Sequence, residues 1–190
     1  TEALTLTSVT TNDGAILVTA TGQNIIATSV TSSTSSDAND ITLTTVTSGN
    51  ITLGTVTATG AGDVTLVAAG AGVIANAAGN AGAEIVADVF TVTDATSIGV
   101  GGNGPVDINA TTASITGVSG AILVDAVGSG GLALTATTTA AGGITVTTST
   151  EALTLTSVTT NDGAILVTAT GQNIIATSVT SSTSSDANDI

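Results

Sequence analysis

The side chains best suited to chemistry in this sequence are the carboxylates and amides of a polar loop that occurs twice. The loop reads TSSTSSDAND at residues 31–40 and again at residues 180–189. Carboxylate and amide oxygens in a loop are the hard ligands that Ca²⁺ prefers in proteins. The candidate calcium ligands are Asp37, Asn39, Asp40, Asp186, Asn188 and Asp189. The alternative interpretation is that these residues form turns and are solvated at the surface.

A second stretch carries a superficial calcium motif. Gly101 to Asp107 reads GGNGPVD and resembles a calcium-binding nonapeptide repeat, but the Asp stands one place late and the motif occurs once. Calcium is therefore the only cofactor for which the sequence offers candidate ligands, and no other cofactor is expected.

Catalytic side chains are almost absent. The chain has no Lys, Arg, His, Cys, Met, Trp or Tyr. Activation of a Ser or Thr nucleophile needs a base, and the usual bases are missing. A pair of carboxylates could serve a glycosidase, but Phe90 alone cannot supply the aromatic platforms that bind sugars. The sequence predicts that the protein is not an enzyme and has no catalytic residues.

The charge is entirely negative. Fourteen acidic residues and no basic ones give a formal net charge of −14, which argues against binding nucleic acid phosphates or an anionic membrane face. No apolar run reaches the ~18 residues of a membrane-spanning helix. We expect no nucleic-acid partner and no membrane insertion. Each carboxylate must lie in water, cap a turn or meet a metal ion.

The strands and turns that position these residues share a short sequence pattern, here called the phrase. It occurs twice in ITLTTVTSGNITLGTVT at residues 41–57. Its apolar positions are Ile41, Leu43 and Val46 in one copy and Ile51, Leu53 and Val56 in the next. A spacing of two places residues on one face of a strand, whereas a spacing of three needs a bend to keep the third residue inside. The phrase therefore predicts a strand that turns a corner, with a turn at residues 48–50.

Looser copies of the phrase recur along the chain. They begin at Leu4, Ile16, Ile25, Ile41, Ile51, Val64, Val73, Ile85, Val106, Ile122, Leu132 and Ile144, and Phe90 occupies the third position of the copy at Ile85. Recurrence of a strand-and-turn unit without a helical period is typical of solenoids. Intrinsic disorder is disfavoured because 42% of the residues are apolar and patterned. Tandem immunoglobulin-like sandwiches are the other alternative fold.

Every second phrase, with Ile98 added, gives one starting residue per coil. The series is Leu4, Ile25, Ile51, Val73, Ile98, Ile122, Ile144 and Ile165, with steps of 21 to 26 residues. Steps of this size match the number of residues expected in one coil of a parallel β-helix. We predict an all-β parallel β-solenoid with six or seven coils per 149 residues. The count is formally half-integral, because the series ends on the copy of Ile16 rather than on the copy of Leu4.

The chain contains a long exact duplication. Residues 1–41 recur unchanged as residues 150–190, so residues 1–149 form one full tandem repeat and 150–190 begin the next without a linker. A designed or edited sequence is the alternative origin. At ~4.8 Å per coil one repeat should advance ~29–34 Å. We expect Leu4 and Leu153 in the core, on the same side for a whole number of coils and on opposite sides for a half-integral number.

Threonine raises a different class of function. The chain has 42 Thr residues, and Thr-x-Thr pairs can form a flat ice- or surface-binding face when they align on successive coils. Such pairs are Thr45/Thr47, Thr55/Thr57, Thr91/Thr93 and Thr145/Thr147. Their uneven spacing predicts that they do not align, and Thr is common at outward strand positions in any case.

Segments such as GNITLGTVTATGAGDVTLVAAGAGVI (residues 49–74) resemble the secreted bacterial β-strand repeat proteins, including filamentous-haemagglutinin-like adhesins and other giant surface proteins. The resemblance covers nearly all of the chain but lies in rhythm and composition. It implies a right-handed solenoid at or outside the cell surface and assigns no catalytic residue.

These observations predict an extracellular or cell-surface structural protein that builds a fibre, stalk or sheath. The alternative is the stalk of a large adhesin whose binding tip lies elsewhere, and an ice- or calcium-binding repeat module ranks below both. The chain opens on Thr1 rather than Met and neither end has a polar cap. We therefore expect part of a longer protein that partners itself in a continuous or end-to-end filament.

Overall fold

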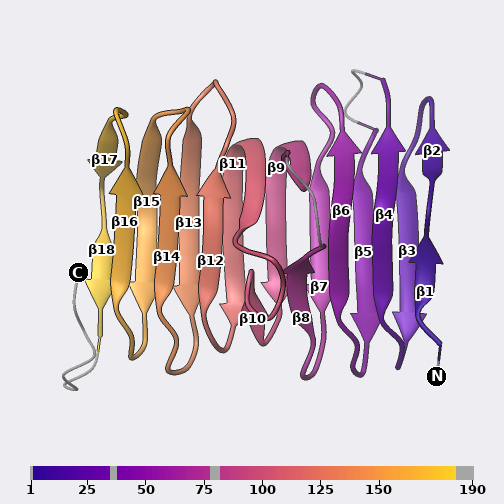
Figure 1. Cartoon of the computed structure of the whole chain (residues 1–190), viewed down its shortest axis with the longest axis horizontal. Helices are drawn as coiled ribbons and strands as arrows, with labels where there is room; N and C mark the ends of the chain where they lie inside the picture. The colour runs from indigo at the N-terminus through magenta and orange to yellow at the C-terminus, as the bar shows by residue number, and fades with distance from the viewer. Residues whose placement is uncertain (1, 35–37, 78–81, 183–190) are drawn as a thin grey trace.

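The computed structural model describes residues 2–34, 38–77 and 82–182. Figure 1 shows a single elongated stack of strands that run perpendicular to the long axis. The strands are β1 (Leu4–Leu6), β2 (Val9–Thr11), β3 (Ile16–Thr21), β4 (Ile25–Ser32), β5 (Ile41–Val46), β6 (Ile51–Ala58), β7 (Val64–Ala68), β8 (Val73–Asn76), β9 (Ile85–Asp94), β10 (Ser97–Ile98), β11 (Val106–Val118), β12 (Ile122–Ala126), β13 (Leu132–Thr138), β14 (Ile144–Thr148), β15 (Leu153–Thr160), β16 (Ile165–Ala169), β17 (Ile174–Ala176) and β18 (Val179–Ser181). The described residues contain no helix long and apolar enough to cross a membrane.

All named strands belong to one sheet of parallel pairings that winds into a β-solenoid. Strands of successive coils pair, as β4 does with β6 and β5 with β7. We call face 1 the side formed by β1, β2, β4, β6, β8, β10, β12, β14 and β16, and face 2 the side formed by β3, β5, β7, β13, β15, β17 and β18. The long strands β9 and β11 begin beside face 1 and continue along face 2, where they pair with β7 and β13.

The residues predicted to begin each coil lie in one row on face 1. Direct pairing joins Leu4, Ile25, Ile51, Ile74, Ile98, Ile122, Ile144 and Ile165 in that order. The predicted fold and coil length are confirmed, with one correction: Ile74 rather than Val73 occupies the row. Ile74 is the buried residue of this pair, and the sequence left the register ambiguous because Val73 and Ile74 are adjacent apolar residues.

The two sequence repeats are offset by half a coil. Leu4 pairs with Ile25 on face 1, whereas its copy Leu153 pairs with Leu132 on face 2. Six steps along the row join Leu4 to Ile144, and Leu153 follows half a coil later. Leu153 is fully buried as expected, but Leu4 is 36% exposed. The prediction that both lie in the core is wrong for Leu4, which has a neighbouring coil on one side only.

The two copies of the sequence phrase fold differently. In β6 the chain bends and Val56 is buried, as predicted. In β5 the strand stays straight, so that Thr45 is buried and Val46 is 41% exposed. The Thr45 hydroxyl donates to the carbonyl of Gly49 at 2.8 Å, which satisfies the buried polar group. The prediction that Val46 points inward is therefore wrong.

Phe90 also differs from its predicted position. It pairs with Val64, the first apolar residue of its phrase, rather than with a third-position residue. β9 passes from one face to the other within its ten residues, which restarts the inward-outward alternation. The Phe90 ring is fully buried beside Ala113 of the next coil, so a small residue accommodates the only aromatic one.

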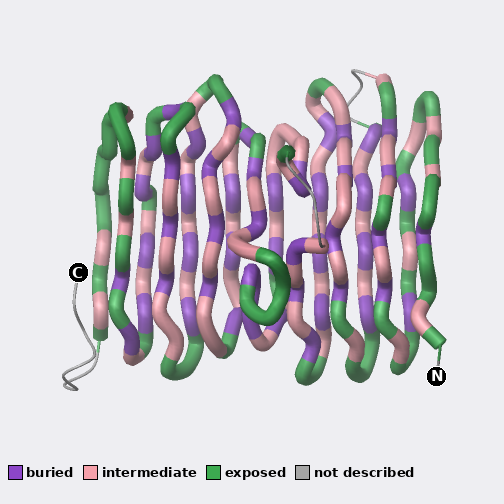
Figure 2. The backbone as a smooth tube through the Cα atoms, in the orientation of Figure 1, coloured by how far each residue is buried: buried purple, intermediate pink, exposed green. Residues whose placement is uncertain are grey.

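The core runs the length of the stack between the two faces. Figure 2 shows buried and less buried residues alternating along most strands, as the period of two requires. The interior side chains are Ile, Leu, Val and Ala from every coil. Their burial is the main stabilising term, because each fully buried Ile or Leu contributes about 1.5–3 kcal/mol.

Candidate functional site

The described calcium candidates make hydrogen bonds within the protein. Asn39 is buried; its Oδ1 accepts from the Thr34 hydroxyl at 2.7 Å, and its Nδ2 donates to the carbonyls of Thr34 and, at 3.3 Å, of Thr59. Asp40 Oδ1 accepts from the Asp63 backbone N–H at 3.0 Å. Both side chains therefore fix the loop to the next coil. The other candidates, Asp37, Asp186, Asn188 and Asp189, lie outside the described residues.

Asp40 belongs to a series of side-chain-to-backbone hydrogen bonds between successive coils, which was not predicted from the sequence. Asp63 Oδ1 in turn accepts from the Val89 N–H of the following coil at 3.1 Å. A second series links Asn24 to the Asn50 N–H at 2.8 Å and Asn50 to the Val73 N–H at 2.9 Å. Each side chain thus satisfies a backbone donor one coil away. The signal was present, because Asn or Asp directly precedes the phrases at residues 25, 41, 51 and 64.

Among the described residues, two carboxylates are buried, although the chain contains no basic residue. The Glu151 side chain accepts from the Gly128 N–H at 3.0 Å and the Gly131 N–H at 2.9 Å. Glu84 Oε2 accepts from the Asp107 N–H at 2.7 Å. Backbone N–H groups take the place of counter-ions here, because hydrogen bonds to a carboxylate stabilise its charge. Glu151 follows the expectation that a carboxylate in this chain caps a turn. Glu84 instead accepts from a backbone N–H of strand β11, which was not predicted from the sequence.

The Gly101–Asp107 motif does not form a ligand loop around Asp107. Asp107 lies on β11, in direct register with Asp125 of β12. Burial, and then the neighbouring Asp125 carboxylate, raise the pKa of Asp107 above its ordinary range. Among the described residues no three or more Asp and Glu side chains gather in a group that could hold a metal ion.

One small depression lies on the surface, with a volume of about 110 Å³. It is lined by Ala87, Asn109, Ala110, Thr111, Gly130 and Gly131. Its polar side chains are one amide and one hydroxyl, which can bind by hydrogen bonding but cannot act as an acid or a base at neutral pH.

A regular surface feature of the described residues is a row of hydroxyl groups on face 2. Direct pairing aligns six residues of six successive coils, namely Thr42, Thr65, Thr91, Ser114, Thr135 and Ser157. We call this row the hydroxyl column. The sequence predicted only that the Thr-x-Thr pairs do not align. Single hydroxyl residues do align, because turns of unequal length absorb the differences in spacing.

The Thr-x-Thr pairs named from the sequence do not form one array. Thr45 points into the core, and Thr47 has a φ of 78° in a turn. Thr91 belongs to the hydroxyl column, whereas Thr145 lies on face 1 beside Leu123 and Leu166. Alignment therefore involves single residues rather than the pairs.

No family model, curated protein or solved structure matches the chain significantly. The resemblance to bacterial surface repeat proteins rests on the sequence rhythm alone.

Proposed function

We propose that this chain builds an extracellular structural protein, in which a repetitive β-solenoid forms a fibre, stalk or sheath on the cell surface. The observation that carries the proposal is the junction between the two sequence repeats. β15, from the second repeat, pairs with β13 of the first through Leu132/Leu153 and Leu134/Leu155. A repeat therefore adds to the previous one through the same backbone ladder that joins coils within a repeat.

The chemistry of the junction supports a structural role. Glu151, the second residue of the duplicated segment, is 3% exposed and is held by Gly128 and Gly131 of the preceding repeat. Parallel coils leave unpaired backbone groups at an open end, which favours further stacking. The proposed partner is the same protein, in a continuous or end-to-end filament. A net charge of −14 supports a protein that binds neither nucleic acid nor membranes.

The proposal is tested by deleting the repeats in the parent organism and imaging its surface. Loss of a visible fibre or sheath is the expected result. Loss of attachment with surface fibres intact would instead favour the alternative, a stalk whose adhesive tip lies outside this chain. Antibodies against this chain that label only permeabilised cells would contradict the proposed extracellular location.

Calcium binding is tested separately on the purified chain. Because Asn39 and Asp40 already bond to Thr34, Thr59 and the Asp63 N–H, we expect chelation to leave the melting temperature unchanged. A fall in melting temperature on chelation, restored by Ca²⁺, would show that the loops bind the ion.

A further inference from the structure

The hydroxyl column is more regular than the Thr content of the chain explains. The matching outward row on face 1 alternates hydroxyl and apolar residues: Thr5, Ile26, Thr52 and Ala75, and then Leu123, Thr145 and Leu166. Both rows occupy outward positions of the same coils and draw on the same composition. Only face 2 carries six hydroxyl residues in succession, so face 1 serves as an internal control for chance.

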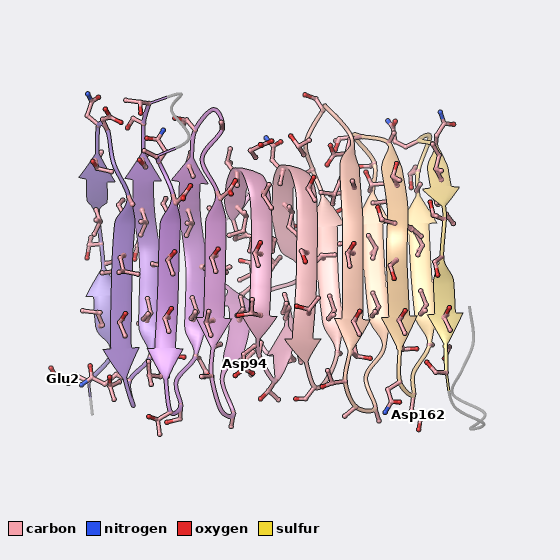
Figure 3. All side chains as sticks on the ribbon, turned by 180° about the vertical axis from the view of Figure 1, so that it is seen from behind. Glu2, Asp94 and Asp162 are labelled. Atoms are coloured by element: carbon pink, nitrogen blue, oxygen red, sulfur yellow. The ribbon has the colours of Figure 1, made fainter. Side chains whose placement is uncertain are left out.

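Carboxylates lie beside the hydroxyl column but not within it. Face 1 places two carboxylates side by side, Asp107 and Asp125. On face 2 the column contains no acidic residue; Asp40 and Asp63 directly precede β5 and β7, and Asp94 is the last residue of β9. Figure 3 views the molecule from behind and shows Glu2, Asp94 and Asp162 at one edge of the stack, where the strands end. The column is therefore a strip without carboxylates along which two copies of this polyanion can approach.

The column is one-dimensional. Two residues further along the strands, Thr44 pairs with Val67 and Val67 with Asp94, so no second hydroxyl row runs beside it through these coils. A single row with the ~4.8 Å spacing of strands matches a partner with the same axial spacing better than it matches a planar lattice. Another β-solenoid of this kind has that spacing.

We propose that the hydroxyl column is a lateral contact at which a second copy of this chain packs, face 2 against face 2. The inference rests on the proposed fibre function and names its sideways partner. A Thr or Ser hydroxyl both donates and accepts a hydrogen bond, so the column is complementary to itself. Such an arrangement is isologous, with the same patch contributed by each copy.

The area of the column sets how strong this contact is. Six strands span ~29 Å along the axis and five residues span ~17 Å along a strand, which gives ~500 Å² per copy. Stable complexes bury ~800 Å² per partner. One repeat therefore associates weakly, and long arrays associate through many such contacts at once.

The half-coil offset determines on which side of a fibre each lateral contact lies. Leu17, which adjoins the column through Thr42, lies on face 2, whereas its copy Leu166 lies on face 1. The column of each repeat therefore lies on the opposite side from that of the repeat before. Lateral contacts then join a fibre to neighbours on both sides and build a ribbon or sheet rather than a closed pair.

Single cysteines test the contact directly, because the chain has none of its own. Thr65→Cys, Thr91→Cys and Ser114→Cys place a thiol in the column, and Thr52→Cys and Thr145→Cys are matched controls on face 1. The purified 190-residue variants are oxidised at a series of concentrations, and disulfide-linked dimers are quantified by non-reducing electrophoresis. We expect at least one column variant to dimerise about tenfold faster than either control, with a larger difference in high salt, where charge repulsion is screened. Equal rates for the two faces would overturn the proposal.

A second pair of variants distinguishes a specific contact at the column from disulfide formation by random collision. Thr91→Asp, added to Ser114→Cys, should abolish the rate advantage, whereas Thr145→Asp added to the same variant should leave it intact. Adsorption of the wild-type chain to ice or to an insoluble polysaccharide, lost in Thr91→Asp and without dimer formation, would assign the face to another occupant and overturn self-association. These measurements need no cell-surface fibre, so their failure is distinct from failure of the deletion test.

Discussion

Residues 2–33 and 151–182 have identical sequences but different surroundings. Ile25 is fully buried in the first copy, whereas the equivalent Ile174 is 43% exposed in the second. For Leu4 and Leu153 the residue of the first copy is the more exposed one. The reason is that the first copy stacks on other coils only on its C-terminal side, and the second copy only on its N-terminal side. Local sequence thus sets where strands and turns form, and the adjacent coil decides which residues are buried.

The same contrast appears over a shorter range between β5 and β6. Their sequences, ITLTTV and ITLGTV, differ at one position among the first six residues. β6 bends where Gly54 lies against β4, since a Cβ on Gly54 would lie 2.4 Å from the Thr28 carbonyl oxygen. β5 has Thr44 at that position and stays straight. The bend in β6 therefore occurs at the residue that lacks a side chain, Gly54.

Substitutions at paired core positions should give the largest difference between the two copies. Ile25→Ala should reduce the free energy of unfolding by about 2–5 kcal/mol because it opens a cavity. Ile174→Ala should cost about 1 kcal/mol or less because its side chain is already part-exposed. Leu153→Ala and Leu4→Ala should show the opposite order between copies. Urea unfolding followed by circular dichroism measures all four, and equal losses within each pair would show that neighbours do not set burial.

The junction carboxylate should give the next largest effect. Glu151→Ala leaves the Gly128 and Gly131 N–H groups without their acceptor, at a cost of about 1.5–3 kcal/mol. Glu2→Ala, the same change in the first copy, should alter stability by about 0.5 kcal/mol or less. Glu151→Gln keeps one carbonyl acceptor and should fall between them. Thermal unfolding compares the three, and a Glu151→Ala variant as stable as Glu2→Ala would argue against a role at the junction.

The corner at Gly54 should tolerate less change than the matching position of β5. Gly54→Ala forces a methyl group against the Thr28 carbonyl, which we expect to cost about 1–3 kcal/mol as overpacking does. Thr44→Ala removes a half-buried outward side chain and should cost less than about 1 kcal/mol. Chemical denaturation of both variants is the measurement, and a neutral Gly54→Ala would mean that the bend has another cause.

The paired carboxylates on face 1 should give the smallest effect, with a defined pH dependence. The folded chain holds the Asp107 proton more tightly than the unfolded chain, because the folded-state pKa is raised. This group therefore favours folding at low pH, and that contribution is lost as pH rises through the raised pKa. Asp107→Asn should raise stability at pH 7 by about 0.2–1 kcal/mol, the range for cross-strand pairs.

Below about pH 3, where carboxyl groups are protonated in both states, Asp107→Asn should match the wild type. Glu2→Gln is the control for loss of one charge at an exposed position. Melting curves at the two pH values make the comparison, and a gain that persists at low pH would point to a cause other than charge.

Much of the fold was predictable because β-branched and Leu residues at a period of two mark inward positions. Coil length, parallel stacking and the half-integral coil count all follow from the spacing between Leu4 and Ile165. The predictions failed where two adjacent residues compete for one inward position. Val73 and Ile74 are adjacent, and Thr45 displaced Val46 because its hydroxyl found an acceptor in Gly49.

The candidate site was less predictable, since outward residues carry no burial pattern. Alignment of Thr42, Thr65 and Thr91 depends on how much chain each turn absorbs, which sequence spacing does not reveal. The capping roles of Asp40 and Asp63 depend on a backbone donor one coil away. Both features come from three-dimensional register, whereas the composition indicated only that Thr and Asp are frequent.

The half-coil offset between Leu4 and Leu153 has a consequence for the evolution of such arrays. Exact tandem copies invite recombination, which adds or removes whole units. Each unit gained or lost lengthens or shortens the rod by ~31 Å, at ~4.8 Å per coil, and also turns whatever follows it by half a revolution. The number of units therefore sets both the length of the rod and the direction in which a distal part points. Changes by an even number of units preserve the direction in which a distal part points, and changes by an odd number reverse it.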